Sequence, residues 1–119
     1  MNKKQKIGEF GEKIAEEFLL RNNYEIVSKN IKISYQEIDI IAKKNKMFIF
    51  VEVKTRTSFK FGNAEDSVGS KKIKNLKKAI GNYIYDKKIN GNFIRLDLIS
   101  ININKIKKTA NIKHYKDIF

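Results

Sequence analysis

The segment 37–56 constrains the fold most, because it holds two apolar, β-branched runs on either side of a short polar interruption. Both runs, 37–42 and 47–53, are rich in Ile, Val or Phe, which are residues that strands favour. The lysines and asparagine between them are typical of a turn. The segment therefore predicts a β-hairpin.

The predicted hairpin brings two carboxylates together. A two-residue turn at 45–46 places Asp39 directly opposite Glu52, and a four-residue turn keeps the same register. A three-residue turn shifts the register by one and makes the two acids diagonal neighbours, so they stay close in each case. Directly opposed side chains have Cβ atoms about 5 Å apart, and like charges at that separation destabilise a sheet. The pair therefore requires a compensating interaction.

Two interpretations account for the acidic pair. A divalent cation such as Mg²⁺ is commonly held by one or two carboxylates and would cancel their repulsion. Lys54 lies two residues beyond Glu52, points to the same face and adds a positive donor beside such an ion. The alternative is a solvated sheet face with cross-strand ion pairs, such as Glu37 opposite Lys54. Spacing alone leaves both interpretations open.

The opposite face of the predicted hairpin is apolar, since side chains alternate along a strand. We expect it to pack against a single core, on the side away from the acids. This face comprises Ile38, Ile40, Ala42, Met47, Ile49, Val51 and Val53.

Residues 8–22 have the periodicity of an amphipathic helix that packs on the sheet. Three acids, Glu9, Glu12 and Glu16, follow one another at spacings of three and four along the edge of the apolar stripe. An acid such as Glu9 in a first helical turn also suits the helix dipole, which is a sufficient structural reason for its presence. The expected buried stripe is Phe10, Gly11, Ile14, Ala15 and Phe18.

Residues 70–88 predict a second helix, with Ser70 as its N-cap. Lys71 and Lys72 fall in the first turn, where positive charge opposes the helix dipole and costs roughly a few tenths of a kcal/mol each. A phosphate bound at this end would offset that cost, whereas a solvated helix face is the alternative for any single lysine. The expected buried stripe is Ile73, Leu76, Ile80, Tyr83 and Ile84, and the candidate nucleic-acid-binding lysines are Lys71, Lys72, Lys74, Lys77 and Lys78.

Three further strands are predicted at 24–33, 93–103 and 111–115. The loop over 57–70 is longer than a simple connector and is expected to cover the site. The order of one helix, three strands, one helix and two strands predicts an α+β or α/β layered domain. Such a domain has a mixed sheet with a helix on each face or with both helices near one face.

Two polar residues near the C-terminal strands have simpler explanations than catalysis. Asp97 lies among Leu and Ile residues far along the chain from the acidic pair, so we expect it to be structural. His114 is the single histidine and is expected to be an exposed strand residue. Neither residue is a predicted metal ligand.

The charge of the chain is strongly positive and unevenly distributed. It carries 26 Lys and Arg against 13 Asp and Glu, for a formal net charge of +13. Residues 53–119 hold 16 of the basic residues and 5 of the acidic ones. This excess favours a polyanionic partner, with nucleic acid first and an anionic membrane surface or an acidic protein as alternatives.

Length and composition limit the remaining classes. A chain of 119 residues with 41% hydrophobic residues is expected to form a single domain, 1–119. It has no cysteine, which excludes disulfides and thiolate metal sites, and its apolar runs are too short for a membrane span or a signal peptide. We therefore expect a cytoplasmic protein with no membrane association.

An acid in one strand followed by Glu52, Val53 and Lys54 in the next resembles the PD-(D/E)xK nuclease signature. The blocks GEFGEKIAEEFL, QEIDIIA, FIFVEVKTR, IRLDLIS and NIKHYKDIF, in this order, resemble the YraN-like family over nearly the whole chain. That family is related to Holliday-junction resolvases. Two positions depart from the pattern, because Ile38 stands where the superfamily's name places proline and Gln36 stands where glycine is expected. Neither change removes a ligand.

The resemblance implies a fold and an activity. The fold is a restriction-endonuclease-like core, in which a mixed sheet has one helix on each side and a parallel strand pair follows the second helix. The activity is that of a Mg²⁺- or Mn²⁺-dependent endonuclease acting on nucleic acid, with DNA favoured and branched DNA as a candidate substrate. Resolvase relatives act as dimers, which implies a homodimer, although no apolar stripe here is plainly a dimer face.

The resemblance also implies roles for individual residues. Glu12, Asp39 and Glu52 are the implied metal ligands, together with the Val53 carbonyl. Lys54 is the residue that would position the attacking water and help to deprotonate it. The implied catalytic set is Glu12, Asp39, Glu52 and Lys54.

Arg56 stands at the exit of the second hairpin strand and is suited to bidentate phosphate contact, so it is a candidate substrate-binding residue. Two functions from other classes remain as alternatives. One is a non-catalytic nucleic-acid-binding module on a nuclease-like fold, and the other is an adaptor for an acidic protein.

Overall fold

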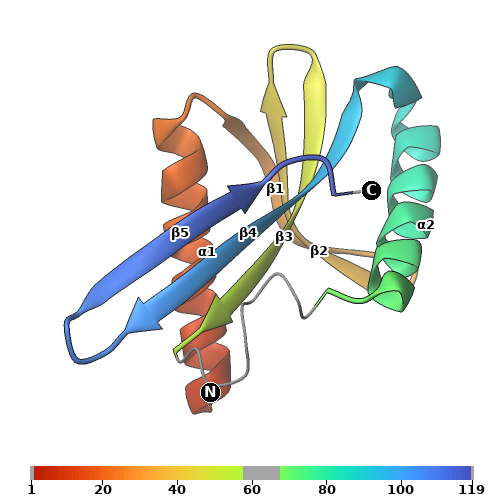
Figure 1. The fold of residues 1–119 in the computed structure, drawn as a ribbon. Coiled ribbons are helices and arrows are strands. Elements are labelled where there is room, and N and C mark those ends of the chain that lie inside the picture. The colour runs from red at the N-terminus through yellow and green to blue at the C-terminus, as the bar shows by residue number, and fades with distance from the viewer. Residues whose placement is uncertain (1, 58–67, 119) are drawn as a thin grey trace.

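The computed structural model of the chain describes residues 2–57 and 68–118 (Figure 1). The expected order of elements is confirmed. It comprises α1 (Lys3–Arg21), β1 (Glu25–Ile33), β2 (Gln36–Lys44), β3 (Met47–Arg56), α2 (Ser70–Lys87), the short 3-10 helix η2 (Gly91–Phe93), β4 (Ile94–Asn104) and β5 (Thr109–Tyr115). The predicted loop over 57–70 falls largely outside the described residues.

The five strands form one mixed sheet in the order β1-β2-β3-β4-β5. The pairs β1 with β2, β2 with β3 and β4 with β5 are antiparallel. The pair β3 with β4 is parallel, and α2 lies in the connection between these two strands. The predicted parallel pair after the second helix is therefore confirmed, and the α+β architecture is that of a restriction-endonuclease-like core.

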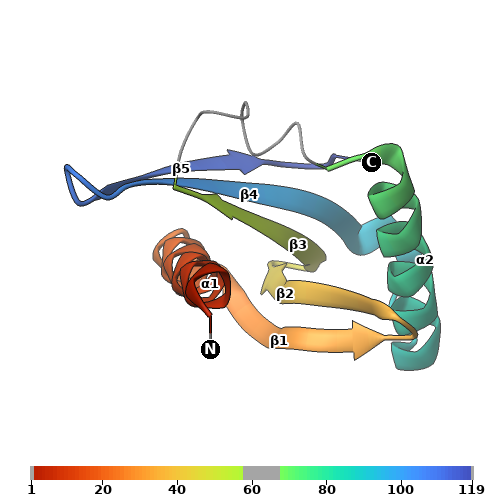
Figure 2. The same cartoon turned by 90° about the horizontal axis from the view of Figure 1, so that it is seen from below.

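The two helices cover opposite faces of the twisted sheet, as Figure 2 shows. Each helix has its own cluster of buried apolar side chains, so the expectation of a single core on one face of the hairpin was wrong. The acid-bearing face also buries Ile41 and Phe50, because α2 packs over them. The cluster under α1 comprises Ala15, Leu19, Tyr24, Ile40, Ala42, Ile49, Val51, Ile99 and Ile101, and the cluster under α2 comprises Ile38, Ile41, Phe50, Leu76, Ala79, Ile80 and Leu96.

Ile38 was expected on the same face as Ile40, but it packs in the α2 cluster. The pairing of β2 with β3 extends only from Lys44 and Met47 to Ile40 and Val51. Upstream of Ile40 the strand β2 stays paired with β1 and is not paired with β3. Strict alternation across the hairpin therefore does not apply to this part of β2.

Helix α1 begins earlier than predicted, because Asn2 and Gln5 form a capping box. The Asn2 side chain accepts from the Gln5 N–H at 2.8 Å, and the Gln5 side chain accepts from the Asn2 N–H at 3.1 Å. The first turn is consequently basic, and Glu9 lies beyond it. Phe10 was expected to be buried but is 54% exposed, and the buried positions are Gly11, Ala15 and Leu19.

Gly11 packs directly against β3. A Cβ atom built on Gly11 would overlap the side chain of Thr55 on β3. Only glycine therefore allows the helix to lie this close to the end of β3. This approach carries the next residue, Glu12, toward the acids of the hairpin.

Helix α2 begins at Ser70, whose predicted role as N-cap was wrong. Gly69 occupies the N-cap position, and no side-chain hydrogen bond caps the helix. The buried residues of the helix are Leu76, Ala79 and Ile80, and the ring of Tyr83 meets Phe50 edge-on at 5.6 Å between centroids. Across the described ranges, neither helix has the length and apolar character needed to cross a bilayer.

Candidate metal centre

The register predicted for the hairpin is confirmed from Ile40 and Val51 to Lys44 and Met47, and it leaves Asp39 close enough to Glu52 for their charges to interact. The ladder between β2 and β3 ends with the pair Ile40 and Val51, so the two acids lie one step beyond its last rung. There the Val53 N–H donates to Asp39 Oδ2 at 2.8 Å. Asp39 thus uses the backbone amide next to Glu52, and its carboxylate lies at the point where the two strands separate.

Glu52 is buried, with only 4% of its surface exposed. Its Oε1 atom lies 3.8 Å from Lys54 Nζ and 3.9 Å from Lys72 Nζ. Its Oε2 atom is buried and has no hydrogen-bond partner among the described residues. A buried carboxylate oxygen without a partner carries a large desolvation cost, which a bound cation or donor would remove.

The surroundings raise the pKa values of both acids of the hairpin. Burial, followed by the nearby Asp39 carboxylate, raises the pKa of Glu52 to about 7, while Lys72 and Lys54 act in the opposite direction. Burial also raises the pKa of Asp39, against the hydrogen bond from the Val53 N–H. Negative charge is therefore costly here without additional positive charge, which favours cation binding.

Helix α1 contributes a third carboxylate, Glu12. Burial first and then the charge of Asp39 raise the pKa of Glu12. The side-chain amide of Asn30 on β1, with its nitrogen turned toward Glu12, donates to both carboxylate oxygens at 3.1 and 3.2 Å. Helix α1 thus brings Glu12 close to Asp39.

Glu37 is a fourth acid of the site, and its expected place was wrong. It was expected opposite Lys54, but β2 and β3 are no longer paired at this position. One carboxylate oxygen each of Glu12, Glu37 and Asp39 lie within 4.8 Å of one another. The sequence carried a signal for this arrangement, because Glu37 and Asp39 are two residues apart on one strand.

Three of these acids, Glu12, Asp39 and Glu52, line a groove of about 680 Å³ that is also lined by basic side chains. Lys54 and Arg56 both line it, because residues two apart on a strand point to the same face and β3 stays paired with β4 as far as Arg56. Three further lysines come from the N-terminus of α1 and from the β4–β5 turn. They are Lys3, Lys4 and Lys105, and sequence reasoning missed them because no local pattern connects these distant segments.

The predicted lysine cluster of α2 is divided in the structure. Lys72 turns inward and approaches Glu52. The other members, Lys71, Lys74, Lys77 and Lys78, are exposed along the helix. Lys72 therefore lies beside Glu52, although it does not line the groove, whereas the other four lysines form an exposed basic surface on the helix.

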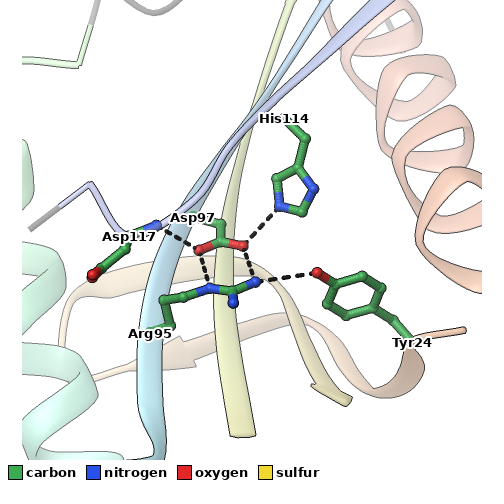
Figure 3. Close-up of polar contacts among 5 residues, drawn as sticks. All are labelled: Tyr24, Arg95, Asp97, His114 and Asp117. Atoms are coloured by element: carbon green, nitrogen blue, oxygen red, sulfur yellow. Dashed lines mark hydrogen bonds and ion pairs between the residues drawn. The ribbon is translucent and has the colours of Figure 1, made fainter. Parts of the chain in front are cut away.

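A second polar network lies in the interior under β4 and β5 and does not line this groove (Figure 3). Asp97 is fully buried and accepts two hydrogen bonds of 2.8 Å from Arg95, whose guanidinium also donates to the Tyr24 hydroxyl at 3.1 Å. The Asp117 N–H donates to Asp97 at 2.9 Å. Burial alone would raise the pKa of Asp97, but hydrogen bonds from His114 and Arg95 hold it below its ordinary value. These contacts agree with the predicted structural role of Asp97.

His114 was expected to be exposed, and this expectation was wrong. Its Nε2 atom lies 2.7 Å from Asp97 Oδ2, and only 9% of its side chain is exposed. Its ring also meets Phe18 of α1 edge-on at 5.8 Å. His114 therefore links β5 to both β4 and α1. These contacts join residues far apart in the sequence, so they could not be predicted without the tertiary fold.

The sheet topology and the flanking helices define an α+β domain with a restriction-endonuclease-like core, and a group of acids lies where β2 and β3 separate. Within this class, the chain belongs to the family described as Uncharacterised protein family UPF0102, whose model matches residues 11–101. The predicted resemblance to the YraN-like family is thus confirmed.

Relatives in this family match almost the entire chain. A UPF0102 protein of Caldicellulosiruptor bescii is 42% identical over 120 residues, covering 100% of both chains. A UPF0102 protein of Clostridium botulinum is 39% identical over 113 residues, covering 95% of this chain and 93% of the relative. A UPF0102 protein of Clostridioides difficile is 44% identical over 101 residues, covering 85% and 88% of the two chains.

Proposed function

We propose that this protein is a metal-dependent endonuclease that hydrolyses nucleic-acid phosphodiester bonds, with DNA as the favoured substrate and branched DNA as a candidate. The observation that carries the proposal is the buried Oε2 atom of Glu52, which has no hydrogen-bond partner in the described parts of the chain and lies near Asp39 in a groove lined by lysines. Acids at the base of a cationic groove suit a metal ion and a phosphate together.

The side chains present fit Mg²⁺ or Mn²⁺. The candidate ligands are carboxylates, and hard oxygen donors of this kind suit these ions. Asp39, Glu52 and Glu12 would hold the ion, together with the Val53 carbonyl. When bound, it would supply charge stabilisation for the phosphoryl group and acidify a coordinated water.

The position of Lys54 supports a role in handling the attacking water. It follows Glu52 by two residues on the same face of β3, and its ammonium group lies 3.8 Å from Glu52 Oε1. Glu52 thus orients the Lys54 side chain toward the acids. In the proposed reaction Lys54 positions the water and assists the loss of its proton.

The basic side chains of the groove would hold the nucleic-acid backbone. Arg56 of β3 and Lys105 of the β4–β5 turn line the groove, and Lys72 of α2 approaches Glu52 beside it. Contacts of this kind bind phosphates without reading bases. Binding is therefore expected to weaken steeply as salt concentration rises, because bound phosphates release counterions.

The test is incubation of the purified protein with branched, flapped and linear DNA in Mg²⁺ or Mn²⁺. We expect cleavage by the unaltered protein and little or none by Asp39→Asn or Lys54→Ala. Cleavage that persists in both variants would refute the assigned roles. DNA binding without cleavage, and without metal uptake that depends on Asp39, would instead identify a non-catalytic nucleic-acid-binding module.

A further inference from the structure

The β4–β5 hairpin extends past the end of β3. Pairing of β3 with β4 ends at Arg56 and Asn102, whereas pairing of β4 with β5 continues to Asn104 and Thr109. The tip of this hairpin, residues 105–108, projects beyond the other strands in both views (Figures 1 and 2). It is therefore placed to contact something outside the body of the protein.

The tip is held in shape and carries an apolar side chain into solvent. Asn104 Oδ1 accepts hydrogen bonds from the Ile106 N–H at 3.1 Å and from the Lys107 N–H at 3.0 Å. These bonds fix the turn as soon as the strands end. Ile106 is 94% exposed. A single exposed aliphatic residue is ordinary on a protein surface, so its meaning depends on its neighbours.

The neighbours of Ile106 are basic, and they connect the tip to the groove. The segment 98–116 contains five lysines and no acid. One of them, Lys105, lines the same groove as Glu52 and Asp39. A polyanion that occupies the groove will therefore also meet the hairpin tip. The lysines of the segment are Lys105, Lys107, Lys108, Lys113 and Lys116.

We infer that the hairpin tip inserts Ile106 as an apolar wedge into the minor groove of a nucleic-acid duplex, while Lys105, Lys107 and Lys108 hold the adjoining phosphates. This inference rests on the proposed function and adds that its substrate includes a duplex beside the cleaved bond. Proteins that bend duplexes insert side chains such as isoleucine between base steps in this way. An isoleucine flanked by lysines matches that requirement.

The position of the wedge relative to the cleaved bond follows from the strand geometry. Glu52 pairs with Leu98, and the last paired residue of β4, Asn104, lies six positions further along the strand. At about 3.3 Å per residue, the tip begins roughly 20 Å from the acids. A duplex that follows the hairpin has a base pair about every 3.4 Å, so the wedge falls roughly six base pairs from the scissile phosphate.

An anionic membrane surface would also attract lysines around an exposed isoleucine. The position of Lys105 favours a duplex over a membrane. This lysine lines a groove, which a nucleic-acid backbone can enter and a flat membrane surface cannot. The membrane is therefore an outcome for the experiment to separate from the inference.

The experiment measures duplex binding and base unstacking without cleavage. A duplex of about 30 base pairs carries 2-aminopurine at successive positions, and binding is followed in EDTA by anisotropy and by 2-aminopurine fluorescence. The variants are Ile106→Ser, Ile106→Leu and, as a matched control, Tyr35→Ser. Tyr35 is 96% exposed in the turn between β1 and β2. Vesicles containing phosphatidylglycerol provide the membrane comparison.

We expect Ile106→Ser to bind the duplex about tenfold more weakly, the order expected when an aliphatic side chain loses its buried place. It should also lose a fluorescence increase that the unaltered protein produces at one or two steps, whereas Ile106→Leu and Tyr35→Ser should retain both signals. Equal affinity and fluorescence for Ile106→Ser and the unaltered protein would overturn the inference, as would Ile106-dependent binding to vesicles without duplex binding.

These outcomes are separable from the fate of the proposed function. Binding in EDTA requires neither metal nor cleavage. A protein that does not cleave DNA but gives an Ile106-dependent signal would therefore support the wedge and contradict the proposed nuclease activity. Metal-dependent cleavage by a protein whose duplex binding does not depend on Ile106 would support the nuclease activity and contradict the wedge. Failure of the unaltered protein to bind any duplex overturns the wedge directly.

Discussion

The Val53 N–H donates a 2.8 Å hydrogen bond to Asp39 Oδ2, at the point where β2 separates from β3. This contact fixes the Asp39 carboxylate beside the residue that precedes Val53, which is Glu52. The parting of the strands lets Glu12 approach from α1 on the other side, within 4.8 Å of Asp39 between carboxylate oxygens. The candidate metal centre therefore forms where the pairing of β2 with β3 ends.

Glu52 predicts a pH dependence of stability in the absence of metal. Its pKa is raised to about 7 from an ordinary value of 4.5, chiefly by burial. Between these two pH values the folded protein keeps a proton that the unfolded chain has lost, so the free energy of unfolding falls as pH rises. The full penalty, roughly 3 kcal/mol as an upper limit, is reached above pH 7.

Urea denaturation in a chelator at pH 5 and pH 8 measures this effect. The variant Glu52→Gln should lose much of the decline and be more stable than the unaltered protein at pH 8. Burial raises the pKa values of Asp39 and Glu12 in the same direction, so some decline should remain. Equal stability of the two proteins at pH 8 would contradict the assigned cost of the Glu52 charge.

Gly11 tests the approach of α1 to β3. In Gly11→Ala the new methyl group meets Thr55, so we expect a loss of about 1–3 kcal/mol in unfolding free energy and weaker Mn²⁺ binding through a displaced Glu12. The control is Gly81→Ala in α2, where nothing lies within 4 Å of the new Cβ. That substitution should stabilise the protein by up to about 1 kcal/mol. Similar effects of the two changes would show that the contact of Gly11 with Thr55 does not determine how closely α1 packs on β3.

Asp97 should be one of the most sensitive positions outside the groove. Asp97→Asn leaves the Arg95 guanidinium without its buried partner, so we expect a loss of about 3–5 kcal/mol, measured by urea denaturation. Asp117→Asn is the matched control, because Asp117 contributes its backbone N–H to the network. A loss below about 1 kcal/mol for Asp97→Asn would mean that the network adds little to stability.

The lowered pKa of Asp97 also has a defined pH signature. Its contribution to stability is fully present above the ordinary value of 3.8 and is lost as pH falls through the lower pKa of the folded state. Acid denaturation should therefore begin at a higher pH in Asp97→Asn than in the unaltered protein. Coincident acid transitions of the two proteins would contradict this assignment.

Two lysines of α2 provide a matched pair for the proposed activity. Lys72 lies 3.9 Å from Glu52, whereas Lys74 is exposed two residues further along the helix. Lys72→Ala should lower kcat/KM for DNA cleavage about tenfold to hundredfold, because a charge beside the buried acids stabilises the transition state more than a charge on the open surface. Lys74→Ala should change cleavage by less than about threefold. Equal losses would place both lysines in general backbone binding.

The sequence predicted the parts of the site that depend on local geometry. Alternation along two strands and a short turn were enough to place Asp39 near Glu52, because a hairpin register has few alternatives. The basic groove was not predictable in the same way, since Lys3 and Lys105 are brought to it by different ends of the fold. Their convergence depends on the packing of α1 and on the projection of the β4–β5 hairpin.

The wrong predictions for individual residues have related physical causes. Ile38 and Glu37 were assigned as though β2 and β3 stayed paired along their whole lengths, but the ladder ends at Ile40. His114 was taken for a surface residue because its buried partner, Asp97, is 17 residues away in the chain. The early start of α1 was detectable in principle, because Asn2 and Gln5 have the spacing of a capping box.

Calorimetric titration with Mn²⁺ tests the central claim most directly, using the unaltered protein, Asp39→Asn and Asp86→Asn. Asp86 is an exposed acid of α2 and controls for loss of one negative charge. We predict metal uptake by the unaltered protein and by Asp86→Asn, and loss of that uptake in Asp39→Asn. Uptake that is unchanged in Asp39→Asn, or no uptake by the unaltered protein at millimolar Mn²⁺, would contradict a metal centre between β2 and β3.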